Sequence, residues 1–206
     1  IYKLYQKRWQ RMFKEYKLPL NSFIGGWFIS KKTCDNLINY FNKNKKFTNP
    51  GIFGDQKNGV RQWNVKKEIK DSVDLTIDKL NTKKEIYKYR VDLQKVLNLY
   101  QNKYKYVKEI AKFNVEAFNI QKYPKKGGYK KWHTERVNLE SSKRVLTFMT
   151  YLNNVKDGGT EFKYQKITTP ALKGLTLIWP VDFTHIHRSQ VCNEEKIITT
   201  GWYHYL

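Results

Sequence analysis

The second half of the chain is a succession of short segments rich in β-branched and aromatic residues, and this feature constrains the fold most. The segments cover residues 113–120, 144–153, 160–164, 167–169, 175–179 and 197–203. Val, Ile, Thr, Tyr and Phe favour strands, whereas the Gly, Pro and Asn residues between the segments favour turns. Many short strands joined by turns predict a β-barrel or a β-sandwich.

The first half of the chain has helical periodicity instead. The clearest helix is expected over 83–109, where apolar side chains recur every three or four residues. A shorter helix is expected over 34–43, after a β-rich run at 23–29, and residues 1–18 also approach a helical period. Helices followed by a series of strands predict an α+β protein.

Two segments of the first half lack a clear period. Residues 44–64 are polar and contain several glycines, so we expect a mobile loop there. The apolar residues of 65–80 match neither a helix nor a strand. We expect a single domain over 1–206, in which 1–110 form a helical flank with an N-terminal strand and a mobile loop, and 111–206 form the β-rich core.

The composition describes a globular chain with a large positive charge. It is 40% hydrophobic, which argues against a disordered protein, and no apolar run approaches the ~20 residues of a membrane span. The net charge is +22. Such a charge suits a polyanionic partner, which could be nucleic acid, a ribosome or an acidic protein. The excess of Lys comes with many Asn, Ile, Tyr and Phe residues, as AT-rich codons produce, and we favour this compositional explanation.

The cysteines and the N-terminus bear on location. Cys34 and Cys192 form no C-x-x-C motif and are expected to be reduced thiols. The charged and aromatic N-terminus has no apolar core of a signal peptide. We therefore expect a cytoplasmic protein without a membrane anchor.

The chemistry of the chain is concentrated in its histidines. His133 and Glu135 are two residues apart, so on a strand both side chains would leave the same face. His185 and His187 follow some fifty residues later. Two histidines and one carboxylate with open positions are the ligand set of non-haem Fe(II) sites that use oxygen. A His-x-carboxylate pair is common by chance, and the later histidines make this prediction stronger.

Lys196 follows the second histidine pair and has the same strand parity as Ile198, Thr200 and Trp202. On a strand these side chains would project into the same barrel. A buried lysine needs an anion, and a bound dicarboxylate would supply one.

Residues 123–202 resemble the double-stranded β-helix of the Fe(II)/2-oxoglutarate dioxygenases, in the prolyl 4-hydroxylase branch. The matching pieces, in chain order, are Tyr123-Pro124, Gly128-Tyr129, His133-x-Glu135, Arg144 to Thr147, Tyr151-Leu-Asn153, Asp157-Gly-Gly159-Thr-Glu-Phe162, Pro170, Lys173 to Pro180, His187, Lys196 and Thr200-Gly-Trp202. The pieces WPVDFTHIHR and KIITTGW resemble those of phage and marine bacterial members. The resemblance implies an α+β fold whose core is a jelly-roll or cupin-like double-stranded β-helix, flanked by the N-terminal helices.

The resemblance also implies roles for individual residues. His133, Glu135 and His187 would hold Fe(II), and Lys196 would pair with the distal carboxylate of 2-oxoglutarate. Further residues would bind this co-substrate or form the wall of its pocket: Tyr123, Tyr151, Thr147 and Trp202. The implied co-substrates are 2-oxoglutarate and O2, with ascorbate as a supporting reductant.

Two positions depart from the family pattern or leave a choice open. Glu135 stands where the family usually has Asp, and we favour a glutamate that still binds iron. His185, which follows Pro180 by five residues, also fits some members as the second histidine ligand. We favour His187 because its spacing to Lys196 matches the family.

The implied function is hydroxylation of a protein or peptide side chain, with proline as the leading candidate and with decarboxylation of 2-oxoglutarate to succinate. The alternatives are a β-helix binding module with little or no turnover and a basic face, and an oxygenase that acts on a nucleobase or a small molecule. The resemblance to phage and bacterial members implies the cytoplasm of a bacterium or of a virus-infected host cell. The sequence leaves the oligomeric state open.

Overall fold

The structure is a computed structural model that describes residues 13–57, 60–110 and 112–206. The helices are α2 (Lys31–Lys43), α3 (Lys84–Lys103) and α4 (Lys105–Ile110), and the short 3-10 helices are η1 (Leu20–Ser22), η2 (Lys45–Phe47), η3 (Leu139–Ser141) and η4 (Phe183–His185). The strands are β1 (Gly25–Phe28), β2 (Asn49–Pro50), β3 (Phe53–Lys57), β4 (Val60–Asn64), β5 (Lys70–Asp71), β6 (Val73–Ile77), β7 (Phe113–Tyr123), β8 (Gly128–Tyr129), β9 (Arg144–Tyr151), β10 (Val155–Phe162), β11 (Ile167–Ala171), β12 (Leu175–Pro180), β13 (His187–Ser189) and β14 (Lys196–Tyr205).

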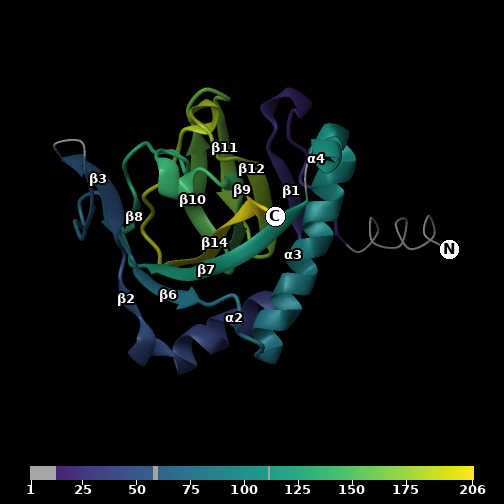
Figure 1. Cartoon of the computed structure of the whole chain (residues 1–206). Coiled ribbons are helices and arrows are strands. Elements are labelled where there is room, and N and C mark those ends of the chain that lie inside the picture. Colours follow the sequence, from purple (N-terminus) through teal and green to yellow (C-terminus); the bar gives the residue numbers. More distant parts are fainter. Residues whose placement is uncertain (1–12, 58–59, 111) are drawn as a thin grey trace.

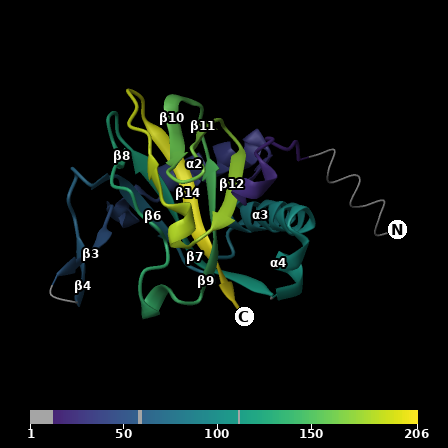
Figure 2. The ribbon, with the colours of Figure 1, turned by 90° about the horizontal axis from the view of Figure 1, so that it is seen from above.

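Two antiparallel sheets form the β-rich part. The large sheet has the strand order β1-β12-β9-β14-β7-β6-β2, and the small sheet has the order β11-β10-β13. Helix α3 lies along one side of the large sheet and α2 lies below it, while β3 projects on the other side (Figure 1). The view from above separates α3 and α4 from β3 and β4 in the same way (Figure 2). This is the double-stranded β-helix core with flanking helices that the sequence resemblance implies, and the expected fold class is confirmed.

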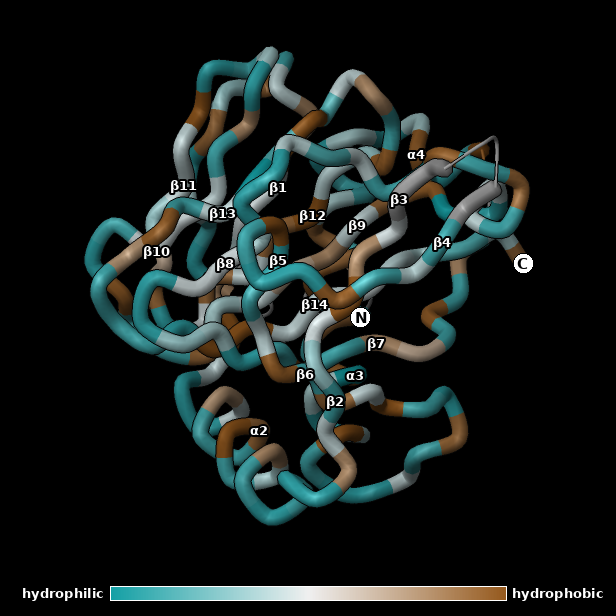
Figure 3. The backbone as a smooth tube through the Cα atoms, turned by 90° about the vertical axis from the view of Figure 1, so that its left-hand side faces the viewer, coloured by the Kyte–Doolittle hydropathy of each residue, from teal (hydrophilic) through white to brown (hydrophobic). Residues whose placement is uncertain are grey.

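The large sheet buries apolar side chains on both faces. Its outer face contributes residues such as Phe148 and Tyr203 to a core that also contains α2 and α3. Its inner face contributes Met149 and Tyr151 to a second core, which faces the small sheet. Alternate residues of β9 therefore belong to different cores, as the period of two of a strand requires. Figure 3 shows the resulting changes of hydropathy from residue to residue along the strands.

Helix α3 is attached to the large sheet through a polar contact as well as apolar packing. Tyr89 is fully buried, and its hydroxyl bonds to the hydroxyls of Thr150 on β9 and Thr199 on β14. The helix buries the apolar positions that recur at three and four residues, as expected. The expected continuous helix over 83–109 is wrong in one respect, because it divides at Tyr104 into α3 and α4.

Other predicted elements need correction. Residues 44–64 are not a loop throughout, because β3 and β4 form an antiparallel hairpin there. The unassigned segment 65–80 contains β5 and β6, of which β6 joins the large sheet. Of the helix expected over 1–18, residues 1–12 lie outside the described part, and residues 13–18 are not helical, since Glu15 forms a bridge with Trp27. Among the described residues, no helix is long and apolar enough to cross a membrane.

Candidate metal and co-substrate site

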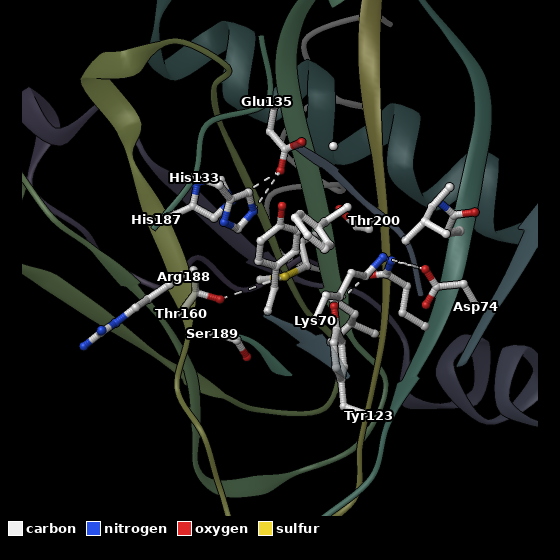
Figure 4. A pocket seen from close by; sticks show the side chains of 18 of the residues that line it. Lys70, Asp74, Tyr123, His133, Glu135, Thr160, His187, Arg188, Ser189 and Thr200 are labelled. Carbon is white, nitrogen blue, oxygen red and sulfur yellow. Dashed lines mark hydrogen bonds and ion pairs between the residues drawn. The ribbon is translucent and has the colours of Figure 1, made fainter. Parts of the chain in front are cut away.

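A cavity of about 700 Å³ opens at the inner face of the large sheet. Its walls come from β7, β9 and β14 of the large sheet, from β13 of the small sheet, and from β3 and the end of β4. The predicted site residues His133, Glu135, His187 and Lys196 all line it. Figure 4 shows the two histidines and Glu135 pointing toward one another.

His133 and Glu135 do not lie on a regular strand, which corrects the expectation from their spacing. His133 forms only an isolated bridge with His187, in which each backbone N–H donates to the carbonyl of the other residue at 3.0 Å. The backbone N–H of Glu135 donates to Val181 O at 3.1 Å. These bonds keep the segment extended, so both side chains still enter the same cavity.

The ligand atoms of His133, Glu135 and His187 lie within 4.8 Å of one another. The Oε1 atom of Glu135 is 3.5 Å from His133 Nε2 and 3.4 Å from His187 Nε2. The Nδ1 atoms face away, toward the carbonyls of Lys131 at 3.0 Å and His185 at 2.9 Å. A backbone acceptor at Nδ1 fixes the tautomer that presents a lone pair at Nε2, as in metal-binding histidines.

The pKa shifts of Glu135 and His133 favour the protonation states that bind a cation. Burial acts to raise the pKa of Glu135, but the hydrogen bonds and charges of His133 and His187 outweigh it and hold the pKa well below its ordinary value. Burial, followed by the neighbouring His187, lowers the pKa of His133. An ionised carboxylate and a neutral imidazole are the forms that metal binding requires. The donor set therefore fits Fe(II) with open coordination positions.

His185 is not part of this group. It lies in η4, is buried, and its Nε2 faces the carbonyl of Ser22 at 2.9 Å, while its Nδ1 faces the hydroxyl of Thr184 at 2.9 Å. Both ring nitrogens are thus engaged in structural contacts. Of the two candidate histidines, the structure brings His187 to the site.

Lys196 is 2% exposed and projects from β14 into the cavity. Its Nζ donates to Gly158 O at 2.8 Å, to Gln190 O at 3.2 Å and to the Ser189 hydroxyl. Burial lowers the pKa of Lys196 to about 8. None of the described partners of this ammonium is a carboxylate, so its charge has no counter-ion among the described residues and suits an anionic ligand.

Two tyrosines lie near Lys196 in the cavity. The Tyr123 hydroxyl donates to Gln121 Oε1 at 2.8 Å, and the Tyr151 hydroxyl bonds to Thr160 at 2.8 Å and to Thr169 at 3.2 Å. Burial raises the pKa of Tyr151 to about 12 and that of Tyr123 well above its ordinary value. Both hydroxyls therefore keep their protons, and the proton of Tyr123 is donated to Gln121.

Thr147 and Trp202 face each other in the register of β9 and β14. Trp202 lines the cavity and donates from its indole Nε1 to Glu135 Oε2 at 3.0 Å. Thr147 is fully buried and is not among the residues that line the cavity. Its hydroxyl has no hydrogen-bond partner among the described residues.

The sequence reasoning missed a polar network beside Tyr123. Asp74 on β6 accepts from Lys70 Nζ at 2.6 Å, from the Ser72 hydroxyl at 2.8 Å and from Gln121 Nε2 at 2.9 Å. Gln121 in turn accepts from Tyr123, so the network orients that hydroxyl. Figure 4 shows the Lys70–Asp74 pair across the cavity from Glu135.

In β6, apolar residues that face the core alternate with polar residues that face the cavity, and this alternation is the sequence signal for the network. Leu75 and Ile77 are buried in the core against the helices, whereas Asp74 and Thr76 line the cavity. The strand is only five residues long, which is too short for the alternation to stand out from the polar residues around it.

Comparison with known proteins agrees with this geometry. The family model described as the 2OG-Fe(II) oxygenase superfamily matches residues 118–204. A prolyl-4-hydroxylase from Pseudomonas putida has a similar structure, with a TM-score of 0.65 and 15% identity over 89% of this chain and 92% of that chain. No curated protein sequence matches the chain.

Two further solved structures resemble the chain. A viral collagen prolyl hydroxylase from Paramecium Bursaria Chlorella virus-1, in a 2OG complex, has a TM-score of 0.56 and 18% identity over 95% of this chain and 97% of that chain. A prolyl hydroxylase from Trichoplax adhaerens, in complex with a peptide fragment of hypoxia inducible factor, has a TM-score of 0.69 and 14% identity over 99% of this chain and 92% of that chain. At these identities the likeness establishes a shared fold.

Proposed function

We propose that this chain is an oxygenase that hydroxylates a prolyl side chain of a protein or peptide. The match of residues 118–204 to the 2OG-Fe(II) oxygenase superfamily supports this proposal. In this reaction 2-oxoglutarate and O2 are consumed, succinate and CO2 are released, and one oxygen atom enters a C–H bond of the substrate. The observation that carries the proposal is one cavity that holds both the cluster of His133, Glu135 and His187 and Lys196, whose described partners include no carboxylate.

The three clustered residues would hold the metal. His133 and His187 would contribute Nε2, and Glu135 would contribute Oε1, because these atoms face one another. The chemistry that Fe(II) supplies in this superfamily is activation of O2, coupled to decarboxylation of 2-oxoglutarate. The protein itself contributes the ionised carboxylate of Glu135 and the cavity that brings the three ligands together.

Lys196 would bind the distal carboxylate of 2-oxoglutarate. Binding places a negative charge beside a buried ammonium whose described partners are all neutral, which supports this role. Tyr123 and Tyr151 would hydrogen-bond the co-substrate, since both line the same cavity. Tyr123 would turn its single proton from Gln121 toward the ligand. The Thr147 hydroxyl has no hydrogen-bond partner among the described residues, so it would be free to form a hydrogen bond in the loaded site. Because Thr147 does not line the cavity, it would act on the co-substrate through a lining residue.

The outer part of the cavity would hold the substrate. Ile52, Trp63 and Val65 are exposed apolar side chains that line it, and they come from β3, β4 and the residues beside them. A proline ring is compact and apolar, so it suits a wall of this kind. The peptide bound by the Trichoplax adhaerens protein, which shares the fold, also supports a peptide substrate.

An assay of co-substrate turnover tests the proposal. Protein supplied with Fe(II), ascorbate and labelled 2-oxoglutarate should release labelled succinate, and a proline-rich peptide should increase the rate and gain one oxygen atom. His187→Ala should remove both signals. Iron binding without any succinate would favour a binding module, and succinate formation stimulated by nucleosides but not by peptides would favour the nucleobase alternative. The cytoplasmic location and the role of ascorbate stay predictions.

A further inference from the structure

The two carboxylate oxygens of Glu135 have different surroundings. Oε1 faces the Nε2 atoms of His133 and His187 at 3.5 Å and 3.4 Å. Oε2 points the other way and accepts a hydrogen bond from the Trp202 indole at 3.0 Å. The indole N–H is a donor only, so this contact requires an acceptor and engages one oxygen alone.

Trp202 is held firmly enough to fix that oxygen. It lies within β14, opposite Thr147 in the central part of the large sheet. The guanidinium of Arg144 stacks on its ring at 3.5 Å and also donates to the backbone carbonyl of Glu135 at 2.9 Å. The backbone N–H of Glu135 donates to Val181. The main chain and the outer oxygen of Glu135 are therefore both anchored to neighbouring strands.

A glutamate at this position needs such an anchor more than an aspartate does. Its additional methylene adds one rotatable bond, and a freely rotating carboxylate can present both oxygens to a cation, as glutamates do in bidentate sites. A carboxylate that supplies two ligand atoms fills a coordination position that an oxygenase metal must leave open for its co-substrates.

We infer that Trp202 is a positioning residue, which holds Oε2 of Glu135 so that only Oε1 faces the metal position. The inference rests on the proposed function and assigns Trp202 a specific task beyond forming a wall of the cavity. It explains how a chain with glutamate in place of aspartate retains a triad with open positions. An aspartate at position 135 is one methylene shorter, so we expect its carboxylate to lose the indole contact when it faces the imidazoles, and the contribution of Trp202 should depend on the glutamate.

Co(II) is the probe that tests this inference, because its visible absorption reports the number and geometry of its ligands without turnover. The proteins are the wild type, Trp202→Phe, Glu135→Asp and the double variant, each checked for folding by thermal unfolding. Phenylalanine keeps an aromatic ring for Arg144 and removes only the indole donor. Trp202→Phe should still bind Co(II), but with weaker visible bands that indicate an added ligand.

The same proteins are then titrated with 2-oxoglutarate. The Co(II)-loaded Trp202→Phe protein should bind 2-oxoglutarate roughly tenfold more weakly, the factor that corresponds to losing one hydrogen bond to a charged group. In the Glu135→Asp background the same Trp202→Phe change should alter 2-oxoglutarate affinity less than about twofold, since the contact is already absent.

A matched control removes a different indole. Trp132→Phe changes a tryptophan whose ring centre lies 4.4 Å from the guanidinium of Arg188, and it should leave the Co(II) spectrum unaltered. The inference is overturned if Trp202→Phe matches the wild type in both measurements, or if its effect is the same in the Glu135→Asp background. If the wild type binds no Co(II), the proposed function fails instead.

Discussion

At the scale of single residues, the spacing of His133 and Glu135 correctly predicts that both side chains point the same way, into the cavity. The strand expected there is absent. The extended backbone is maintained by bonds to His187 and Val181 rather than by a ladder of strand pairs. Side chains two residues apart point the same way whenever the backbone between them is extended, whether or not it belongs to a sheet. The choice between His185 and His187 could not be made in this way, because it depends on η4, which turns His185 toward Ser22.

Replacing each of these two histidines distinguishes the proposed metal ligand His187 from His185, which makes structural contacts. We expect His187→Ala to fold and to lose binding of Mn(II) or Co(II), because one donor of the cluster is removed. His185→Ala should keep metal binding and lose about 1 to 3 kcal/mol of stability, since Ser22 O and Thr184 lose a buried partner. Isothermal titration with metal and thermal unfolding measure the two effects. Loss of metal binding in His185→Ala with an intact fold would contradict this assignment.

Lys196 predicts a pH dependence of co-substrate binding. Its pKa is lowered to about 8 by burial, and in the proposed role only the protonated form would attract the distal carboxylate of 2-oxoglutarate. Below pH 8 the ammonium is already charged, so affinity should be nearly constant. Above pH 8 binding must also take up a proton, and affinity should fall about tenfold for each pH unit. Calorimetric titration of the Co(II)-loaded protein from pH 6.5 to about 9.5 measures this slope.

Lys196→Arg is the control for that slope. Arginine stays charged throughout this range, so the fall in affinity above pH 8 should disappear even if binding is weaker overall because the guanidinium is larger. A slope that persists in the arginine variant would assign the titrating group elsewhere.

At the scale of elements, long regular segments are predictable from the sequence of this chain, and short ones are not. Helix α3 and strand β9 have enough residues for their periods to be recognised. The β3–β4 hairpin has few β-branched residues, and its polar composition resembles a loop. The dipeptide Asn58-Gly59 stands between the two strands in the sequence, and Asn-Gly is a strong sequence signal for a hairpin.

The division between α3 and α4 could not be read from the sequence either. Tyr104 continues the apolar period of α3, so the pattern gives no reason for a break. In the structure its hydroxyl donates to the carbonyl of Leu20, and its ring packs against Phe23 and Tyr100. These contacts with a distant segment determine where the helix ends, and periodicity within the helix carries no record of them.

The hairpin gives a prediction about substrate binding. Trp63 lines the cavity and is 52% exposed, so Trp63→Ala should change stability by less than about 0.5 kcal/mol. It should raise KM for a peptide substrate roughly tenfold, because a large apolar contact is lost, while peptide-independent succinate formation stays the same. Tyr87→Ala is the matched control, since Tyr87 is an exposed aromatic on α3 that does not line the cavity. Equal effects of the two changes would place the substrate elsewhere.

At the scale of the whole molecule, the site depends on strands that are far apart in the sequence. In the large sheet β9 lies between β12 and β14, and β14 lies between β9 and β7. The alternation of each strand indicates which residues face inward, but it does not indicate which strands are neighbours. The double-stranded β-helix was therefore predictable only through its resemblance to a family, whereas Lys196, Ile198, Thr200 and Trp202 could be assigned to one face from parity alone, and all four line the cavity.

The net charge of +22 also acts at this scale, and the fold concentrates part of it beside the cavity. The β5–β8 pair brings Lys66 and Lys67 next to Lys130 and Lys131, and the Lys130 backbone donates to Ile69 O at 2.7 Å. Of these lysines, three are exposed and Lys130 is half-buried. Tyr129 and His133, which flank the second lysine pair in the sequence, line the cavity. These four lysines form a positively charged rim, and a substrate segment that leaves the cavity on this side would contact it.

We expect this rim to favour peptides with acidic residues next to the hydroxylated position. Changing Lys66, Lys67, Lys130 and Lys131 together to Glu should lower kcat/KM for an acidic peptide roughly tenfold or more, and much less for a neutral peptide of the same length. The matched control changes four exposed lysines at or near α2 to Glu: Lys31, Lys32, Lys43 and Lys45. Both variants lose the same positive charge, so equal effects would indicate a general field rather than a local rim. Because exposed charges are screened over about 10 Å at 0.1 M salt, the difference between acidic and neutral peptides should also shrink as salt is added to the wild type.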